Sequence, residues 1–164
     1  MRPKAPQNTE AFLQCSNCKK ILFSIEFEQN LRVCPHCGHH HRLEARKRIE
    51  ITFDPGSFEE LDADLRSTDP LTFPDYAAKL ATAEQKTGAY DSIITGMAAL
   101  EGQSVSTAIA DFNFMGGSMG AVAGEKITRT LERAVEKRVP AVIFSASGGA
   151  RMQEGLLSLM QMGK

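Results

Sequence analysis

The stretch "VIFSASGGARMQEGLLSLMQ", residues 142–161, decides the fold. Its apolar run, opened by Pro140, predicts a buried strand over 141–147 that ends at Gly148 and Gly149. A helix-patterned segment follows at once. A glycine pair at the end of a strand and the start of a helix is the local signature that the rest of the sequence has to explain.

The same order of elements occurs upstream. Residues 92–112 predict two strands around a turn at 101–103, and "MGGSMG" (115–120) predicts a glycine-rich turn before a helix. Strand, glycine turn and helix thus occur twice, which predicts an α/β domain. The helix after 120 is expected to share one face among Val122 or Ala123, Ile127, Leu131, Ala134 and Val135.

Shorter elements are expected before this domain. Residues 42–53 and 76–88 read as helices, the second stopping at Gly88. A turn at 54–56 is expected to lead into a short helix. Residues 67–76 are expected to form a linker. The predicted organisation is a disordered lead-in at 1–11, a cysteine-rich module at 12–41, a helical connecting region at 42–90 and the α/β domain at 91–164.

Composition excludes several classes of protein. The 164 residues are 42% hydrophobic with a formal net charge of -1, so the chain as a whole carries no polyanion-binding signature. The sequence contains no run of 18 apolar residues, so no membrane-spanning helix is expected. The N-terminus lacks the apolar core of a signal peptide. A cytoplasmic location is therefore expected, where cysteines stay reduced.

All four cysteines lie in one C-x2-C-x15-C-x2-C pattern: Cys15, Cys18, Cys34 and Cys37. Two such knuckles place four thiolates around one ion, as tetrahedral zinc requires. Two disulfides or free core cysteines are the alternatives. Four thiolates leave no open coordination position, so a structural rather than a catalytic zinc is predicted, and residues 12–41 are expected to form a zinc ribbon.

Neighbouring histidines and basic residues leave two further alternatives. His36, His39, His40 and His41 are competing zinc ligands, although a complete cysteine set makes them unnecessary. The basic residues of this region are expected to form a surface that could contact a phosphate backbone. The alternative is a solvated helix face, because Glu44 and Glu50 are interleaved with them. The basic residues are Lys19, Lys20, Arg32, Arg42, Arg46, Lys47 and Arg48.

The glycine pairs suggest chemistry that uses the backbone. N–H groups at a helix start lack intrahelical acceptors, and glycines allow a phosphate or a reaction oxyanion to approach them. The dinucleotide, P-loop and hydrolase-elbow signatures are absent, and no histidine lies beyond residue 41. A plain tight turn between strand and helix is the alternative for each pair.

Taken together, the four-cysteine module, "FMGGSMG", "FSASGGARMQEG" and "SLMQM" closely resemble the beta subunits of bacterial acetyl-CoA carboxylase carboxyltransferases. The resemblance runs from about residue 12 to the end of the chain. It implies a ClpP/crotonase-like core of stacked ββα units, here incomplete, behind the zinc ribbon. Beta subunits of this family continue for more than a hundred further residues, so the chain is expected to be truncated and inactive alone.

The resemblance also implies a reaction and partners. The reaction is carboxyl transfer from carboxybiotin, on a biotin carboxyl carrier protein, to acetyl-CoA, giving malonyl-CoA for fatty acid synthesis. The implied partners are a carboxyltransferase alpha subunit in an α2β2 assembly and a separate biotin carboxylase, which uses the ATP. The alternatives are a carboxyltransferase for another acyl-CoA and a zinc-ribbon nucleic-acid-binding protein.

In this interpretation the site residues acquire roles. Gly148, Gly149 and the N–H of Ala150 are expected to form an oxyanion hole in the first turn of the last helix. The group that it would bind is the thioester enolate oxygen or, as a second possibility, the biotin ureido oxygen. Gly116 and Gly117 are expected to shape the CoA site. Arg151 is placed with the substrate-binding residues, where it either contacts a phosphate or braces the turn through a carboxylate such as Glu154.

Overall fold

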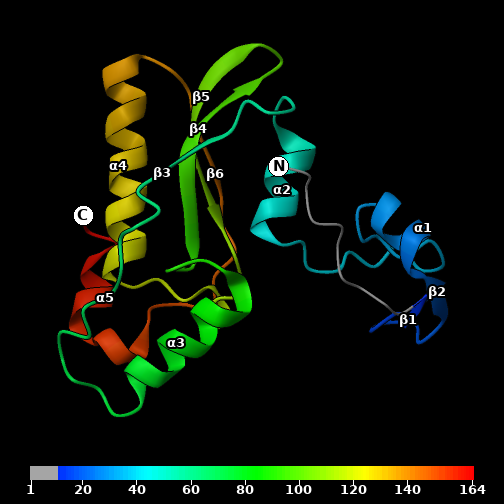
Figure 1. Ribbon diagram of the computed structural model, residues 1–164, viewed down its shortest axis with the longest axis horizontal. Coiled ribbons are helices and arrows are strands. Elements are labelled where there is room, and N and C mark those ends of the chain that lie inside the picture. The colour runs from blue at the N-terminus through cyan, green and yellow to red at the C-terminus, as the bar shows by residue number, and fades with distance from the viewer. Residues whose placement is uncertain (1–10) are drawn as a thin grey trace. The chain divides into compact units, whose positions relative to one another are not determined.

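The computed structural model describes residues 11–164, which form two compact units (Figure 1). One unit comprises the described residues up to Leu43, and the other runs from Glu44 to Lys164. The expected lead-in at 1–11 lies outside the described residues except for residue 11. The region 44–90, expected as a connector, belongs to the same compact unit as the sheet.

The first unit is small and built around its cysteines. Strands β1 (Phe12–Gln14) and β2 (Ile21–Phe23) pair antiparallel, and the helix α1 (Ser24–Gln29) follows directly. Its buried residues are Cys15, Leu22, Phe27 and Cys34. With so few apolar side chains inside, two of which are cysteines, the unit needs a further cross-link for stability.

The second unit is built on a four-stranded sheet in the order β3-β4-β5-β6. Strands β4 (Ile93–Leu100) and β5 (Gln103–Ala110) pair antiparallel, and β3 (Glu59–Leu61) adds to the edge of β4. β6 (Ala141–Phe144) runs parallel to β5. The parallel pair requires the crossover helix α4 (Ala121–Lys137) between them, so β4, β5 and α4 form one ββα unit.

Two helices cover opposite faces of this sheet, as Figure 1 shows. α2 (Ala45–Thr52) packs against Ile94, Ile109 and their same-face neighbours, whereas α4 packs against Ile93 and Ala108. Neighbouring strand residues point to opposite faces, so both faces of β4 and β5 are buried. This explains why these strands read as continuous small and apolar residues.

A third helix and three short elements lie at one end of the sheet. α3 (Tyr76–Thr87) packs through Tyr76, Leu80 and Ala83 on Phe114, directly before the 3-10 turn η1 (Met115–Gly117). After β6 come a second 3-10 turn, η2 (Met152–Glu154), and the short helix α5 (Leu156–Met160). The α/β class and the ββα arrangement predicted from sequence are confirmed.

Three local predictions are wrong. The segment after the turn at 54–56 is the edge strand β3 rather than a helix, because it completes the sheet beside β4. β6 is only half buried, because it forms the sheet's other edge. The last helix does not begin at the glycine pair, since the chain first pairs with Met119 and then makes η2.

α4 buries only part of the expected apolar stripe: Val122, Ala123 and Ala134 are buried and Ile127 packs against the core. Lys126 and Thr130 face the sheet, where Lys126 Nζ donates to the Ile93 carbonyl (3.1 Å) and the Thr130 carbonyl accepts from Ser106 Oγ (2.8 Å). Leu131 and Val135 are exposed instead. Polar contacts to the sheet therefore act together with apolar burial in setting the rotation of this helix.

The apolar side chains of α5 are exposed. Leu156, Leu159 and Met160 each expose more than half of their surface, whereas Ser158 is buried. Among residues 11–164, no helix has the length and apolar character that crossing a membrane demands.

Candidate functional site

The two glycine turns are in direct contact, although Gly116 and Gly148 are 32 residues apart in sequence. Gly148 N–H donates to the Gly116 carbonyl (2.9 Å). Met119 then pairs with Ala150 in a parallel bridge, in which Met119 N–H donates to Gly149 O (2.9 Å) and Arg151 N–H donates to Met119 O (2.8 Å). The structure therefore brings together all six site residues that the sequence predicts at the two turns: Gly116, Gly117, Gly148, Gly149, Ala150 and Arg151.

Glycine is required here by close approach and by backbone conformation. Gly117 has φ +66°, and a Cβ on it would collide with the carbonyl oxygen of Ala146 in the other turn. Gly149 has φ +120°, a backbone angle that residues with a side chain rarely adopt. The glycines thus allow the backbones of the two turns to contact each other. A plain tight turn between strand and helix, the alternative considered from the sequence, would not need this close approach.

The three N–H groups of the predicted oxyanion hole are not equivalent. Gly148 N–H is occupied by Gly116, and Gly149 N–H donates to Ser147 Oγ (3.1 Å). Within the described part of the chain, Ala150 N–H has no hydrogen-bond partner, and the residue is exposed. The donor that faces outward therefore lies on a bridge between the turns, and not in the first turn of a helix.

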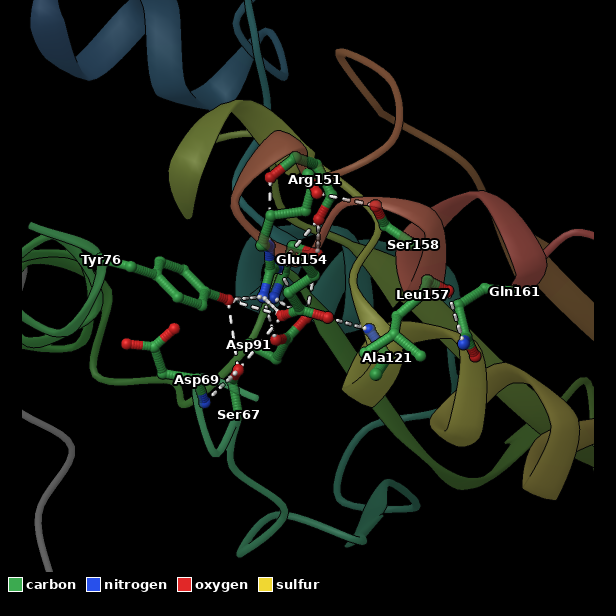
Figure 2. A network of polar contacts seen from close by, with 12 residues as sticks. Ser67, Asp69, Tyr76, Asp91, Ala121, Arg151, Glu154, Leu157, Ser158 and Gln161 are labelled. Atoms are coloured by element: carbon green, nitrogen blue, oxygen red, sulfur yellow. Dashed lines mark hydrogen bonds and ion pairs between the residues drawn. The ribbon is translucent and has the colours of Figure 1, made fainter. Parts of the chain in front are cut away.

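Arg151 lies beneath this bridge in a buried polar network (Figure 2). Its guanidinium is 0% exposed and pairs with Asp91 in a two-pronged contact, Nη1 to Oδ2 (2.7 Å) and Nη2 to Oδ1 (3.0 Å). Nη2 also donates to the Ser118 carbonyl (2.8 Å) in the first glycine turn. One side chain thus joins both turns to the start of β4.

Glu154 forms the other half of the network. Its carboxylate accepts from Tyr76 Oη (2.5 Å) on α3 and from the backbone N–H of Ala121 (2.6 Å) in the first turn of α4. Burial raises its pKa, but these donors and Arg151 together hold the pKa below its ordinary value. A charged Glu154 therefore stabilises the positive end of α4 from 33 residues away.

The structure favours bracing over phosphate contact for Arg151. Burial lowers its pKa, but Asp91 and Tyr76 raise it further, so the guanidinium stays charged and every nitrogen has a partner. A side chain with no exposed surface has no access to a ligand in this state. Asp91 was missed in the sequence, since an isolated acid before a strand carries no pattern.

The four cysteines converge as predicted. Their Sγ atoms all lie within 4.8 Å of one another, and Cys15 to Cys37 and Cys18 to Cys34 are 3.9 and 3.8 Å apart. A tetrahedron with metal–sulfur bonds of about 2.3 Å has sulfurs about 3.8 Å apart, so the cluster fits one metal ion. These distances also exclude disulfide bonds, which need about 2 Å.

Polar neighbours favour the thiolate form of one of the four cysteines. The Asn17 side-chain amide and the His39 backbone N–H lower the pKa of Cys37 to about 6, which favours its thiolate. His41 contacts Cys15 through Nε2 at 3.4 Å, outside the group of four sulfurs. The histidines are therefore neighbours of the candidate metal centre rather than members of it.

The expected basic surface is divided. Lys19, Lys20, Arg32 and Arg42 belong to the first unit, and Arg46, Lys47 and Arg48 to the second. Several of these charges are also neutralised, because Arg32 pairs with Glu28, Arg46 with Glu60 and Lys47 with Glu50. The pairing favours solvated faces over one continuous nucleic-acid surface.

A four-cysteine ribbon and a crotonase-like ββα unit with two apposed glycine turns together define the class of a carboxyltransferase component. Comparison with known proteins agrees. Residues 39–164 match the family described as the carboxyl transferase domain, and residues 12–37 match the acetyl-CoA carboxylase zinc finger domain. The chain belongs to the carboxyl transferase domain family.

Its relatives carry one consistent name. The acetyl-coenzyme A carboxylase carboxyl transferase subunit beta of Desulfitobacterium hafniense (strain Y51) is 54% identical over 153 residues, covering 93% of this chain and 50% of that protein. The subunit of the same name from Synechococcus sp. (strain JA-3-3Ab) is 52% identical, covering 92% and 49%. The chain spans about half the length of the curated relatives it matches.

Solved structures of related enzymes share the fold. A transcarboxylase 12S structure with methylmalonyl-coenzyme A and methylmalonic acid bound has a TM-score of 0.62 and 32% identity, covering 74% of this chain and 22% of that one. A Pseudomonas malonate decarboxylase hetero-tetramer in complex with malonate has a TM-score of 0.54 and 30% identity, covering 74% and 43%.

Proposed function

We propose that this chain acts as part of a beta subunit of acetyl-CoA carboxylase carboxyltransferase in the cytoplasm. The reaction is carboxyl transfer to acetyl-CoA, giving malonyl-CoA. One observation carries the proposal: a single chain combines the acetyl-CoA carboxylase type of zinc finger with a carboxyl transferase domain. Carboxyltransferases for other acyl-CoA substrates are the nearest alternative.

The outward N–H of Ala150 is the chain's proposed catalytic contact. An enolate oxygen formed from a thioester needs donors that are fixed before the charge develops. Ala150 N–H has no partner among residues 11–164, and the bridge to Met119 fixes its backbone. Gly149 N–H becomes a second donor when Ser147 Oγ turns away, because that hydroxyl is its one acceptor in the described part of the chain.

Arg151 and Glu154 have a positioning role in this scheme. They hold the two turns together through Asp91, Ser118 and the first turn of α4. Carboxybiotin, delivered by the biotin carboxyl carrier protein, supplies the carboxyl group. The alpha subunit is the proposed partner in an α2β2 assembly, and ATP is used by a separate biotin carboxylase.

The cysteine cluster is proposed to bind one structural zinc. Loss of any thiolate opens the tetrahedron, so changing Cys34 or Cys37 to Ser should reduce zinc from one to well below one equivalent per chain. Atomic emission on the purified protein measures this directly. Ser16→Ala is the matched control, because Ser16 is exposed, lies next to Cys15 and is not one of the four thiolates. This variant should leave the zinc content unchanged. Full zinc content in both cysteine variants would contradict the four-thiolate centre.

A chimera tests the activity. Residues 12–164 would replace the matching half of the Desulfitobacterium beta subunit, and the product would be assayed with alpha subunit and carboxybiotin carrier for malonyl-CoA. We expect transfer to acetyl-CoA, and a loss of at least tenfold when Gly149→Val shifts the turn from φ +120°. A folded, zinc-loaded chimera that carboxylates only longer acyl-CoA substrates, or none, would overturn the proposal.

A further inference from the structure

The imidazole of His41 contacts a sulfur of the cysteine cluster. Its Nε2 lies 3.4 Å from Cys15 Sγ, 26 residues away in sequence. The four cysteine sulfurs lie within 4.8 Å of one another, and in the described part of the chain no histidine nitrogen belongs to that group. His41 therefore lies beside the candidate metal centre, within hydrogen-bonding distance of one of its ligands.

The chemistry of a metal ligand determines the direction of this hydrogen bond. A cysteine binds a metal as its thiolate, which has lone pairs but no proton, so its sulfur can only accept. The imidazole must then carry a proton on Nε2 and donate it to Cys15 Sγ. In the neutral ring Nδ1 is left without a proton, so the contact selects one of the two neutral tautomers.

The surroundings of His41 hold its ring in this position. Its backbone N–H donates to the Arg32 carbonyl (3.0 Å), which fixes the chain shortly after the second knuckle. Its ring meets the Phe27 ring edge-on, with centroids 4.9 Å apart and planes at 89°. Phe27 is buried in the same small core as Cys15. A ring that is fixed by these contacts loses little conformational entropy when it donates.

The charge of the centre makes such a donor valuable. Four thiolates around one Zn²⁺ carry a net charge of about −2, and burial disfavours that charge unless N–H groups neutralise part of it. Cys15 is 0% exposed, whereas Cys37 is exposed to water and also accepts from the Asn17 side-chain amide (3.6 Å). Backbone N–H groups of Asn17 and Cys18 donate to Cys15. His41 adds a side-chain donor where solvent is excluded.

We propose that His41 donates a hydrogen bond from Nε2 to the Cys15 thiolate and thereby stabilises the bound zinc. The donor draws electron density from the sulfur, which spreads the negative charge of the centre. His41 acts through Cys15 and is not itself a ligand. The inference rests on the proposed structural zinc, because the metal keeps Cys15 in its thiolate form.

Two substitutions in the full 164-residue chain test this. His41→Phe keeps an aromatic ring against Phe27 and removes the donor, whereas His41→Gln places an amide N–H near the position of Nε2. Competition with a chelator measures zinc affinity. We expect Kd for zinc to rise about tenfold in H41F, because loss of a ligand's hydrogen-bond partner weakens metal binding, and to rise less in H41Q.

Replacement of zinc by Co²⁺ supplies a readout that ring packing alone does not change. The sulfur-to-cobalt charge-transfer band should move to longer wavelength in H41F, because a sulfur without its donor gives up electron density more readily. The band in H41Q should lie between those of H41F and the parent chain. His40→Gln is the matched control, because His40 is exposed and makes no hydrogen bond to a sulfur within residues 11–164. It should leave both measurements unchanged.

Three results would overturn the role of His41 and leave the zinc centre intact. The first is a zinc affinity in H41F equal to that of the parent chain. The second is a loss of affinity with an unmoved cobalt band and no recovery in H41Q, which is the pattern of a ring that only packs. The third needs no substitution: long-range proton–nitrogen NMR of the zinc-loaded parent chain would find the proton on Nδ1 instead of Nε2. A parent chain without a four-thiolate cobalt spectrum would overturn the zinc centre and this inference together.

Discussion

Changing Asp91 to Asn should destabilise the second unit far more than an ordinary surface charge change. The substitution keeps the shape of the side chain but leaves Arg151 charged, 0% exposed and without its two-pronged partner. Removing one member of a buried ion pair costs about 3–5 kcal/mol. Arg151 retains the Glu154 carboxylate (3.4 Å), Ser118 O and Tyr76 Oη, so we expect a loss near 3 kcal/mol and a fall in Tm of roughly 10 °C.

Urea unfolding followed by far-UV circular dichroism measures this loss. Hydrogen exchange at Met119 and Arg151 N–H should also accelerate, because both amides belong to the bridge above the ion pair. Glu50→Gln is the control, since Glu50 pairs with Lys47 at a similar distance (2.8 Å) but is 68% exposed. It should cost less than about 1 kcal/mol.

Two results would refute this reasoning. The first is a loss in D91N no larger than that in E50Q. The second concerns the double variant D91L/R151M, in which both charges are removed and apolar groups fill the space. That variant should be more stable than D91N, because the guanidinium charge is gone, while Glu154 keeps its hydrogen bonds from Tyr76 Oη, Ser67 Oγ and the Ala121 N–H. Equal or lower stability would mean that packing, rather than the uncompensated charge, sets the cost.

The remaining predictions concern the glycine turns and acid stability. Gly117→Ala should destabilise the unit by several-fold more than Gly116→Ala in urea unfolding, because both have positive φ but only the Gly117 Cβ collides with Ala146 O; equal losses would argue against contact between the turns. Glu154 has a pKa below its ordinary 4.5, so its contribution is complete above about pH 4.5 and is lost as pH falls through the folded-state pKa. The stability difference between the parent chain and E154Q should therefore shrink below pH 4.5, and a constant difference down to pH 3 would contradict a charged Glu154.

The sequence alone determined the elements whose cause is local. The C-x2-C spacing predicts a cluster because each knuckle is a tight turn, and its sulfurs do converge in the structure. The strand pair 93–110 and the helices α2, α3 and α4 follow from apolar patterns and turn residues near in sequence. The family likewise follows from the glycine-rich motifs as a set.

The tertiary structure decided what depends on contacts distant in sequence. The partner of Arg151 is Asp91, 60 residues away, and Lys126 faces the sheet because the Ile93 carbonyl accepts from it. Neither residue type announces a buried role, since charged side chains are buried only where the fold supplies partners. The contact between the two glycine turns has the same origin. Backbone proximity leaves no mark on the sequence beyond the glycines that permit it, and only the fold shows which N–H group it leaves facing outward.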